Sequence, residues 1–290
     1  MARFISRLLP RRFRPVRVEI PVVRLHGAIM SGGGQFRPTL SLASVAAVLD
    51  KAFADKEAPA VAISINSPGG SPVQSRLIFR RIRDLAEEKN KKVHVFVEDV
   101  AASGGYMIAV AGDEIIADPS SIVGSIGVVS ASFGFTELIK KIGVERRVYT
   151  AGRNKVALDP FQPEKKTDIE HLKSLQLEVH ETFIDLVKAR RGAKLADDPD
   201  LFTGLFWSGT KAQSLGLIDG LGDMRSHLRR EYGPKATLKL VQPQRGLLGW
   251  RTPPAVGLHN GDALAQAAAG ATEGLLSAME EKALWSRYGL

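Results

Sequence analysis

The stretch AVAISINSPGGS, residues 60–71, decides how this 290-residue chain folds. Its first half, Ala60–Ile65, is a short apolar run rich in β-branched residues, which is typical of a buried strand. A loop with a glycine pair follows, and residues 74–88 then place apolar side chains at helical spacing. The order of strand, glycine turn and helix predicts a β-α-β unit with parallel strands.

The same alternation continues on both sides of this unit. The elements predicted around it are strands at 18–29, 92–97, 114–117 and 146–149, and helices at 42–49, 104–111, 136–142 and 164–191. The chain has no repeat at fixed spacing. We therefore predict an α/β fold whose core is a parallel β-sheet flanked by helices.

Charge and composition divide the chain into three parts. The net charge is +9, and residues 1–17 form a basic arm with no acidic residue whose six arginines are Arg3, Arg7, Arg11, Arg12, Arg14 and Arg17. The main domain is predicted at 18–233, and scattered glycines and prolines mark a C-terminal extension at 234–290 with a helix at about 272–288. Because the basic residues lack aromatic platforms, we expect no nucleic-acid partner.

Several classes of protein are excluded by what the sequence lacks. It has no cysteine, so disulfides, zinc–thiolate sites and cysteine nucleophiles are ruled out. Arg7, Pro10 and Arg11 interrupt any apolar run that a secretory signal would need, and the other apolar runs are too short to cross a bilayer. We expect a cytoplasmic protein, with peripheral contact between residues 1–17 and an anionic inner membrane as the alternative.

Two glycine turns follow predicted parallel strands, at Gly69-Gly70 and at Ser103-Gly104-Gly105. Exposed backbone N–H groups at such turns can hold an oxyanion, and Ser103 lies where a helix dipole favours negative charge. Each feature also has a plainer interpretation, because Pro-Gly-Gly is a common turn and a serine before two glycines is often only a helix N-cap.

A nucleophilic serine needs a base, and none of the six histidines is well placed to act as one. These histidines are His26, His94, His171, His180, His227 and His259. A lysine can serve if burial lowers its pKa toward neutrality. Composition alone does not choose among the lysines.

Five motifs together make the sequence resemble the signal peptide peptidase A (protease IV) family of serine peptidases, which includes SohB-like members. They are Ile65–Ser71 (INSPGGS), Ala102–Tyr106 (ASGGY), Gly124–Val128 (GSIGV), Gly152–Lys155 (GRNK), and Phe206–Gly209 (FWSG) with Leu215–Asp219 (LGLID). The resemblance spans about residues 20–233 and implies a ClpP/crotonase-like fold.

The resemblance also implies a serine/lysine dyad, with Ser103 as nucleophile and Lys155 as general base. It assigns the oxyanion hole to the backbone N–H groups of Gly69 and Gly70, and it implies that Ser125 orients the base. No metal or other cofactor is implied. In the plainer interpretations, Lys155 is a surface lysine that follows an asparagine where the family more often has an aromatic residue, and Ser125 stabilises a turn.

The implied activity is endopeptidase cleavage of apolar peptides, such as remnant signal peptides or membrane-associated polypeptides. A single-domain chain is expected to form a homo-oligomer that shares its sites between subunits. Tyr106, Met107 and Ile126 would line the substrate groove or belong to the core. The alternatives are an inactive scaffold of the same fold, and a crotonase-type acyl-CoA enzyme, for which Glu98 and Asp99 make a poor carboxylate pair.

Overall fold

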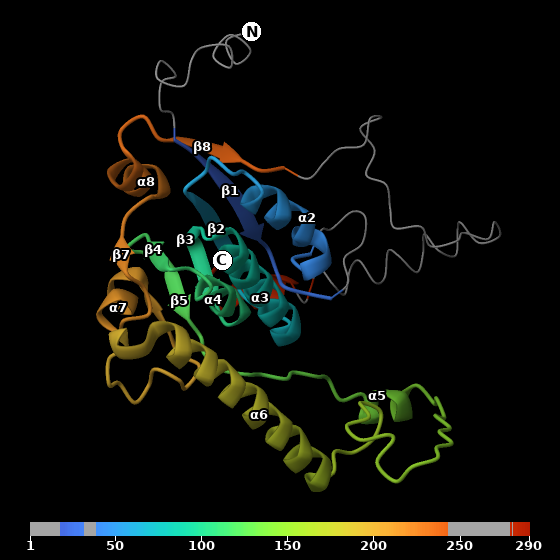
Figure 1. Cartoon of the computed structure of the whole chain (residues 1–290). Helices are drawn as coiled ribbons and strands as arrows, with labels where there is room; N and C mark the ends of the chain where they lie inside the picture. The colour runs from blue at the N-terminus through green and yellow to red at the C-terminus, as the bar shows by residue number, and fades with distance from the viewer. Residues whose placement is uncertain (1–17, 32–38, 243–278, 280) are drawn as a thin grey trace, which may run out of the picture.

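The computed structural model describes residues 18–31, 39–242, 279 and 281–290. Within them an eight-stranded sheet runs in the order β6-β5-β3-β2-β1-β8, with β4 between β3 and β7 (Figure 1). The strands are β1 (Glu19–His26), β2 (Ala60–Ser67), β3 (Lys92–Ala102), β4 (Glu114–Ala117), β5 (Ile122–Gly124), β6 (Phe206–Ser208), β7 (Gly220–Leu221) and β8 (Thr237–Leu240). The helices are α2 (Leu42–Phe53), α3 (Pro72–Lys89), α4 (Gly104–Ala109), α5 (Thr136–Lys141), α6 (Lys166–Arg191), α7 (Gly209–Ser214) and α8 (Met224–Tyr232).

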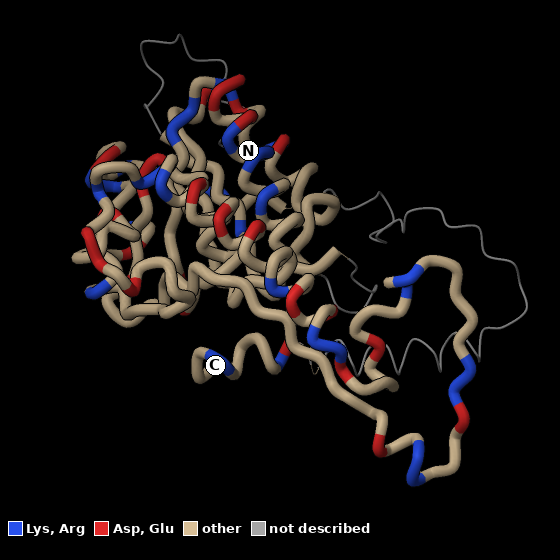
Figure 2. Tube along the Cα trace, turned by 90° about the horizontal axis from the view of Figure 1, so that it is seen from below, with Lys and Arg blue, Asp and Glu red and all other residues tan. Residues whose placement is uncertain are grey.

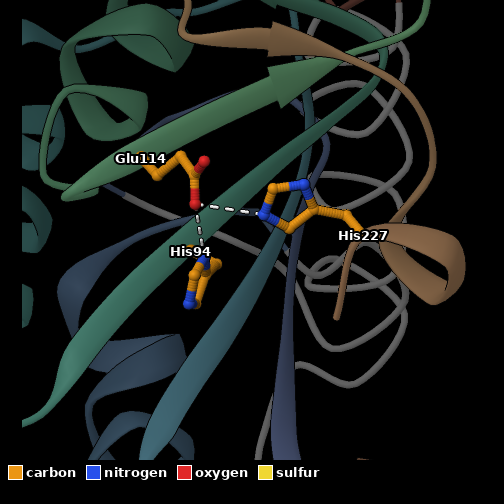
Figure 3. A group of neighbouring side chains, drawn as sticks. All are labelled: His94, Glu114 and His227. Atoms are coloured by element: carbon orange, nitrogen blue, oxygen red, sulfur yellow. Dashed lines mark hydrogen bonds and ion pairs between the residues drawn. The ribbon is translucent and has the colours of Figure 1, made fainter. Parts of the chain in front are cut away.

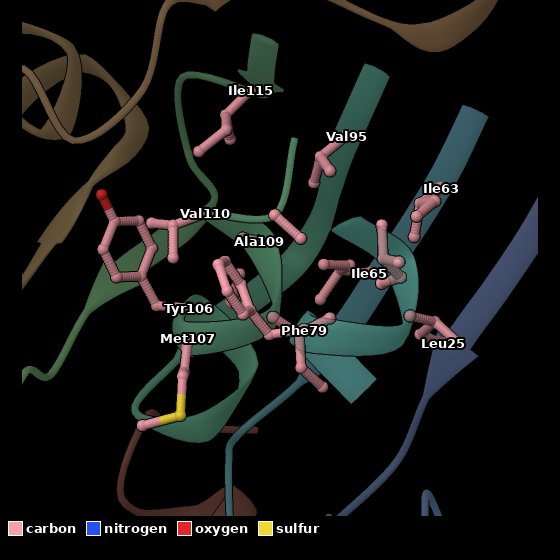
Figure 4. Packing of buried hydrophobic residues seen from close by; sticks show 14 of the residues in the cluster. Leu25, Ile63, Ile65, Phe79, Val95, Tyr106, Met107, Ala109, Val110 and Ile115 are labelled. Atoms are coloured by element: carbon pink, nitrogen blue, oxygen red, sulfur yellow. The ribbon is translucent and has the colours of Figure 1, made fainter. Parts of the chain in front are cut away.

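The sheet confirms the predicted α/β class, because every strand pair is parallel except β5 with β6. Alternate residues of β1 to β3 point to opposite faces. One face packs under α2 and α3, in a core that includes Ile63, Ile65 and Val95 (Figure 4). The other face carries Ile20, Ala62 and Phe96 and packs against Leu228 of α8.

Strand β3 positions the site because it changes neighbours along its length. Its first half pairs with β4 from His94 to Val97, and its end pairs with β5 from Val100 to Ala102. A register shift between Ile65 and Ser67 of β2 accompanies this change. The turns after β2 and β3 therefore meet at the carboxyl edge of the sheet.

The structure differs from the predicted elements at residues 146–149, in β8 and along α6. Residues 146–149 form no strand. Strand β8 lies beyond the predicted domain boundary at residue 233 and pairs with β1. The helical spacing at 164–191 predicts an inward-facing stripe that includes Leu175 and Phe183. Phe183 is buried together with Val187, whereas Leu175 is exposed. The basic arm at 1–17 and most of the predicted helix at 272–288 lie outside the described residues.

Residues 130–165, here called the projecting segment, extend away from the sheet (Figure 1). The segment contains α5, which buries no residue, and it exposes 80% of Phe133 and 90% of Tyr149. It carries both basic and acidic residues (Figure 2).

In the part of the chain that the structure describes, none of the helices combines the length and the apolar character needed to cross a lipid bilayer.

Candidate active site

Ser103 follows the last residue of β3 and has φ 50° and ψ −120°, a conformation that residues with a side chain rarely adopt. Its N–H donates to the carbonyl oxygen of Gly124 at 2.8 Å, which holds the backbone in place. The Ser103 hydroxyl makes no capping hydrogen bond to α4. The N-cap interpretation therefore does not explain this serine, whereas a strained strand-to-helix turn is a known way to present a nucleophile.

The turn at Gly69-Gly70 packs directly against the Ser103 turn. A Cβ atom added to Gly69 would lie 2.8 Å from Cβ of Ser103 and 2.9 Å from N of Gly104. One added to Gly70 would lie 2.1 Å from the carbonyl oxygen of Ile29. Both glycines also have positive φ angles, of 102° and 138°. Only glycine allows the two turns to approach this closely.

Three backbone N–H groups surround this contact and differ in their partners. That of Gly69 donates to Oγ of Ser67 at 3.3 Å. That of Gly70 has no hydrogen-bond acceptor among the described residues. That of Gly104 begins α4, where no carbonyl of the same helix is available to it. The resemblance implies Gly69 and Gly70 as oxyanion donors, and the structure places the N–H of Gly104, which that set omits, beside them.

A cavity of about 230 Å³ opens beside Ser103. Gly70 and Gly104 line it together with apolar side chains that include Met107 of α4 and Phe183 of α6. Of the three residues predicted for a groove, Met107 lines the cavity, while Tyr106 and Ile126 are fully buried core residues. Tyr106 donates from its hydroxyl to the carbonyl oxygen of Leu217 at 2.7 Å, which ties α4 to the segment after α7.

Ser125 is buried and has a positive φ angle of 54°. Its N–H donates to the carbonyl oxygen of Leu205 at 2.7 Å. The preceding residue, Gly124, accepts from Ser103, so one hydrogen bond and one peptide unit connect Ser125 to the candidate nucleophile.

Lys155 lies on the projecting segment, in a turn where its N–H donates to the carbonyl oxygen of Gly152 at 3.2 Å. Its side chain is exposed, and it is not among the described residues that line the cavity of Ser103. The segment that carries it extends away from α4 (Figure 1). The structure thus brings Gly69, Gly70 and Ser103 together, but it does not bring Lys155 to them within one chain.

The other titratable groups near the strand ends already have partners. Glu98 accepts a short hydrogen bond from Ser64, and Asp99 accepts from Nδ2 of Asn66 at 2.7 Å. His180 of α6 contacts the carbonyl oxygen of Ile126 through Nε2 at 3.0 Å. The two carboxylates therefore have separate hydrogen-bond partners.

A second polar cluster, His94, Glu114 and His227, lies at the opposite end of the strands (Figure 3). Oε2 of Glu114 is 3.0 Å from Nδ1 of His94 and 3.0 Å from Nε2 of His227. The sequence hides this cluster, because its members are 20 and 113 residues apart and come from β3, β4 and α8. Its residue types are those of a metal site.

Hydrogen bonding in this cluster argues against a metal. Arg230 contacts Nδ1 of His227 at 2.9 Å, and a guanidinium can only donate. Nε2 of His227 therefore carries the proton that it donates to Glu114, and it has no lone pair for a metal. The hydroxyl of Tyr232 lies 2.7 Å from Nε2 of His94 and can donate to it, as Arg230 does to His227. The cluster is a satisfied network that joins α8 to the sheet.

Burial and neighbouring charges shift the pKa values in this cluster. Burial, followed by the charge of Lys92, lowers the pKa of His94 below its ordinary value. Burial alone would raise the pKa of Glu114, but His227 with its hydrogen bond, together with Lys92 and His94, outweighs burial and lowers it. Both shifts favour neutral His94 beside an ionised Glu114.

Comparison with known proteins identifies the family. The family model described as Peptidase family S49 matches residues 86–232, a range that contains Ser103, Ser125 and Lys155. The chain belongs to peptidase family S49. The S49 match covers about half of the chain and includes the strained serine turn.

Relatives carry two kinds of name. The chain is 33% identical over 215 residues to the chloroplastic serine protease SPPA of Arabidopsis thaliana, covering 72% of this chain and 31% of the relative. It is 32% identical over 219 residues to Protease 4 of Haemophilus influenzae, covering 73% and 34%. It is 75% identical over 287 residues to a protein of Brucella abortus named Na(+)/H(+) antiporter NhaA, covering 99% of this chain but 39% of the relative. The chain thus spans between 31% and 39% of the length of these three relatives.

Proposed function

We propose that this chain is a serine endopeptidase in which Ser103 is the nucleophile and Lys155 the general base. The observation that carries the proposal is the Ser103 turn. It combines a strained backbone, a hydroxyl that makes no capping hydrogen bond to α4, and an adjoining cavity. Family membership supplies the reaction class.

The chemistry follows from the atoms at this turn. Neutral Lys155 takes the proton of the Ser103 hydroxyl as its oxygen attacks the carbonyl carbon of a peptide bond. The N–H groups of Gly70 and Gly104 donate to the oxyanion that forms, while Gly69, whose N–H is engaged by Ser67, shapes the turn. Lys155 then protonates the leaving amine as the C–N bond breaks. Water hydrolyses the resulting ester and regenerates Ser103.

Lys155 reaches Ser103 from a second copy of the chain in this proposal. Within one chain the projecting segment holds Lys155 away from the cavity, and its exposed aromatic residues fit an interface with a neighbouring subunit. Burial at that interface would supply the low dielectric that a neutral lysine needs. Ser125 would accept or donate a hydrogen bond that orients the lysine.

The substrates in this proposal are apolar peptides, including membrane-associated ones. Met107, Val128, Val179 and Phe183 give the cavity a lining that favours apolar side chains. The predicted contact between residues 1–17 and an anionic membrane would bring the protein to such substrates, and it stays a prediction.

Labelling with a fluorophosphonate tests the nucleophile. We expect mass spectrometry to find the adduct on Ser103, and we expect Ser103→Ala to abolish both labelling and peptide hydrolysis. Ser121→Ala is a matched control, because Ser121 is buried near the same strands but donates to the carbonyl oxygen of Glu98. Unchanged hydrolysis by Ser103→Ala would refute the proposal and favour an inactive scaffold with a contaminating activity.

Mixing two inactive variants tests the shared site. Ser103→Ala subunits retain Lys155, and Lys155→Ala subunits retain Ser103, so mixing the two without unfolding them should restore hydrolysis if the dyad forms across subunits. The mixture could stay inactive although native mass spectrometry shows mixed oligomers. That result would mean either that Ser103 and Lys155 act together within one chain or that Lys155 is not the general base. Lys166→Ala, an exposed lysine at the start of α6, is the control for loss of charge.

A further inference from the structure

Residues 281–290, here called the docked segment, pack against the candidate active site although they are far from it in the sequence. Tyr288 is the anchor, with only 7% of its surface exposed. Its ring packs on Val100 and Ala102, the residues of β3 that precede the nucleophile. Its hydroxyl donates to the carbonyl oxygen of Pro68 at 3.4 Å, in the turn that leads to Gly69.

The docked segment also contacts the far side of the site. The ring of Tyr288 meets that of Phe206 in β6 edge to face, with 5.0 Å between centroids. One side chain therefore touches both the turn before Gly69 and the strand beside β5. This anchor holds the neighbouring residues of the docked segment, including the adjacent Arg287, beside the site.

Two residues on the same segment, Leu284 and Arg287, line the cavity beside Ser103. Arg287 is the one charged side chain among the described residues that line it. Within the described part of the chain no carboxylate pairs with Arg287, whose guanidinium lies 5.9 Å from the ring centre of Tyr288. An arginine without an acidic partner beside an otherwise apolar cavity is suited to bind a carboxylate.

We propose that the docked segment forms a wall of the substrate site and that Arg287 selects peptides carrying a carboxylate next to their apolar residues. This inference rests on the proposed function for the identity of the site, and it adds the class of peptide that the site takes. The carboxylate belongs to an acidic side chain or to the peptide's own C-terminus, and the two sources are separable by experiment.

Binding to the full-length Ser103→Ala protein tests the proposal without any chemistry. The probes are fluorescent ten-residue peptides of Ala, Leu and Val with amidated C-termini, in which Glu, Gln or Lys replaces each position in turn. Anisotropy should show Glu peptides binding more tightly than Lys peptides at one or two adjacent positions. Because Arg287 is exposed to solvent, we expect a roughly three- to fivefold difference. A free-acid version of the all-apolar peptide, compared with its amide, reports on the C-terminal carboxylate.

Charge reversal gives the sharper result. In the Ser103→Ala background, Arg287→Glu should invert the preference to Lys, and Arg287→Gln should remove it. Lys282→Glu is the matched control, because it makes the same charge change on the same segment at a residue outside the cavity lining. Tyr288→Ala should weaken the preference without inverting it, since it releases the segment rather than changing its charge.

The outcomes separate this inference from the proposed function. An unchanged ratio of Glu to Lys binding in Arg287→Glu would overturn the inference, and so would the absence of tighter binding by any peptide bearing a carboxylate. Neither result bears on Ser103 chemistry. Conversely, failure of Ser103 to react with a fluorophosphonate would refute the peptidase proposal and leave a carboxylate preference in binding intact.

Discussion

The two ends of the sheet differ in how completely their polar groups are satisfied. At the amino-terminal end of β3 and β4, all four ring nitrogens of His94 and His227 have hydrogen-bond partners, and two of them share Oε2 of Glu114. At the carboxyl-terminal end, the backbone of Ser103 is strained and its hydroxyl makes no capping hydrogen bond to α4. The N–H of Gly70 also lacks a partner among the described residues.

This contrast separates structure from chemistry better than residue types do. Judged by residue types, the histidine cluster is the more convincing catalytic or metal site. The two turns at Gly69-Gly70 and Ser103-Gly104-Gly105 are the weaker candidate. Unused hydrogen-bonding capacity beside a cavity is what a substrate can use, whereas a closed network stabilises the fold. The following changes test that distinction.

Ser103→Gly should have the largest effect and should act in opposite directions on activity and stability. Glycine adopts φ 50° and ψ −120° without strain, so we expect a gain of about 1 kcal/mol in the free energy of unfolding. Peptide hydrolysis should fall by roughly 10⁴-fold or more. Ser103→Ala, which keeps the strain, should lose the activity without the gain in stability. A destabilised Ser103→Gly protein would show that the turn is not strained.

Glu114→Ala should affect stability alone. It leaves ring N–H groups of His94 and His227 without an acceptor in a buried site, which we expect to cost about 3 kcal/mol in the free energy of unfolding. Below its unfolding temperature the variant should keep its kcat. Glu87→Ala is the control, because the Glu87 side chain is 73% exposed and its ion pair with Arg83 is long, at 3.8 Å. Loss of kcat in folded Glu114→Ala would show that the cluster takes part in catalysis and not only in stability.

Gly70→Ala should damage both properties to an intermediate degree. Its Cβ atom would lie 2.1 Å from the carbonyl oxygen of Ile29, so the turn must move away from the segment that follows β1 and carry its N–H with it. We expect about 2 kcal/mol of destabilisation and a fall in kcat rather than a rise in KM. Gly134→Ala, with open space around its Cβ position, is the control for stability and should leave the free energy of unfolding unchanged. Normal kcat in Gly70→Ala would remove this amide from the oxyanion site.

Acidification should have the smallest effect. The lowered pKa of His94 means that the unfolded chain binds a proton more readily, so stability should fall as the pH drops below the ordinary histidine value of about 6.5. The lowered pKa of Glu114 should add a second decline below about pH 4.5.

Thermal unfolding between pH 8 and pH 5 measures this slope. His94→Gln should flatten it only in part, because burial also lowers the pKa of His26. His171→Gln, on an exposed face of α6, is the control. If the dependence of stability on pH is the same in His94→Gln, protonation of His94 is not what destabilises the folded protein at low pH.

Local sequence patterns determined much of this protein. Strands β2 and β4, helix α3 and the two glycine turns follow from short apolar runs, helical spacing and glycines, which act between residues close together in the chain. The alternation of elements also sufficed for the parallel sheet, and hence for the meeting of Ser103 with Gly69-Gly70, because parallel strands with helical crossovers place their carboxyl ends on one edge.

Tertiary structure alone decided the remainder, because those features depend on contacts between residues far apart in sequence. The N–H of Ser103 meets the carbonyl oxygen of Gly124, and that of Ser125 meets Leu205, only because of how β3, β5 and the segment before β6 pack. The exposure of Leu175 depends on where α6 leaves the body, and Tyr288 meets Pro68 across 220 residues. Periodicity reports which face of an element is apolar, but the partner of that face is set by the packing of the whole chain.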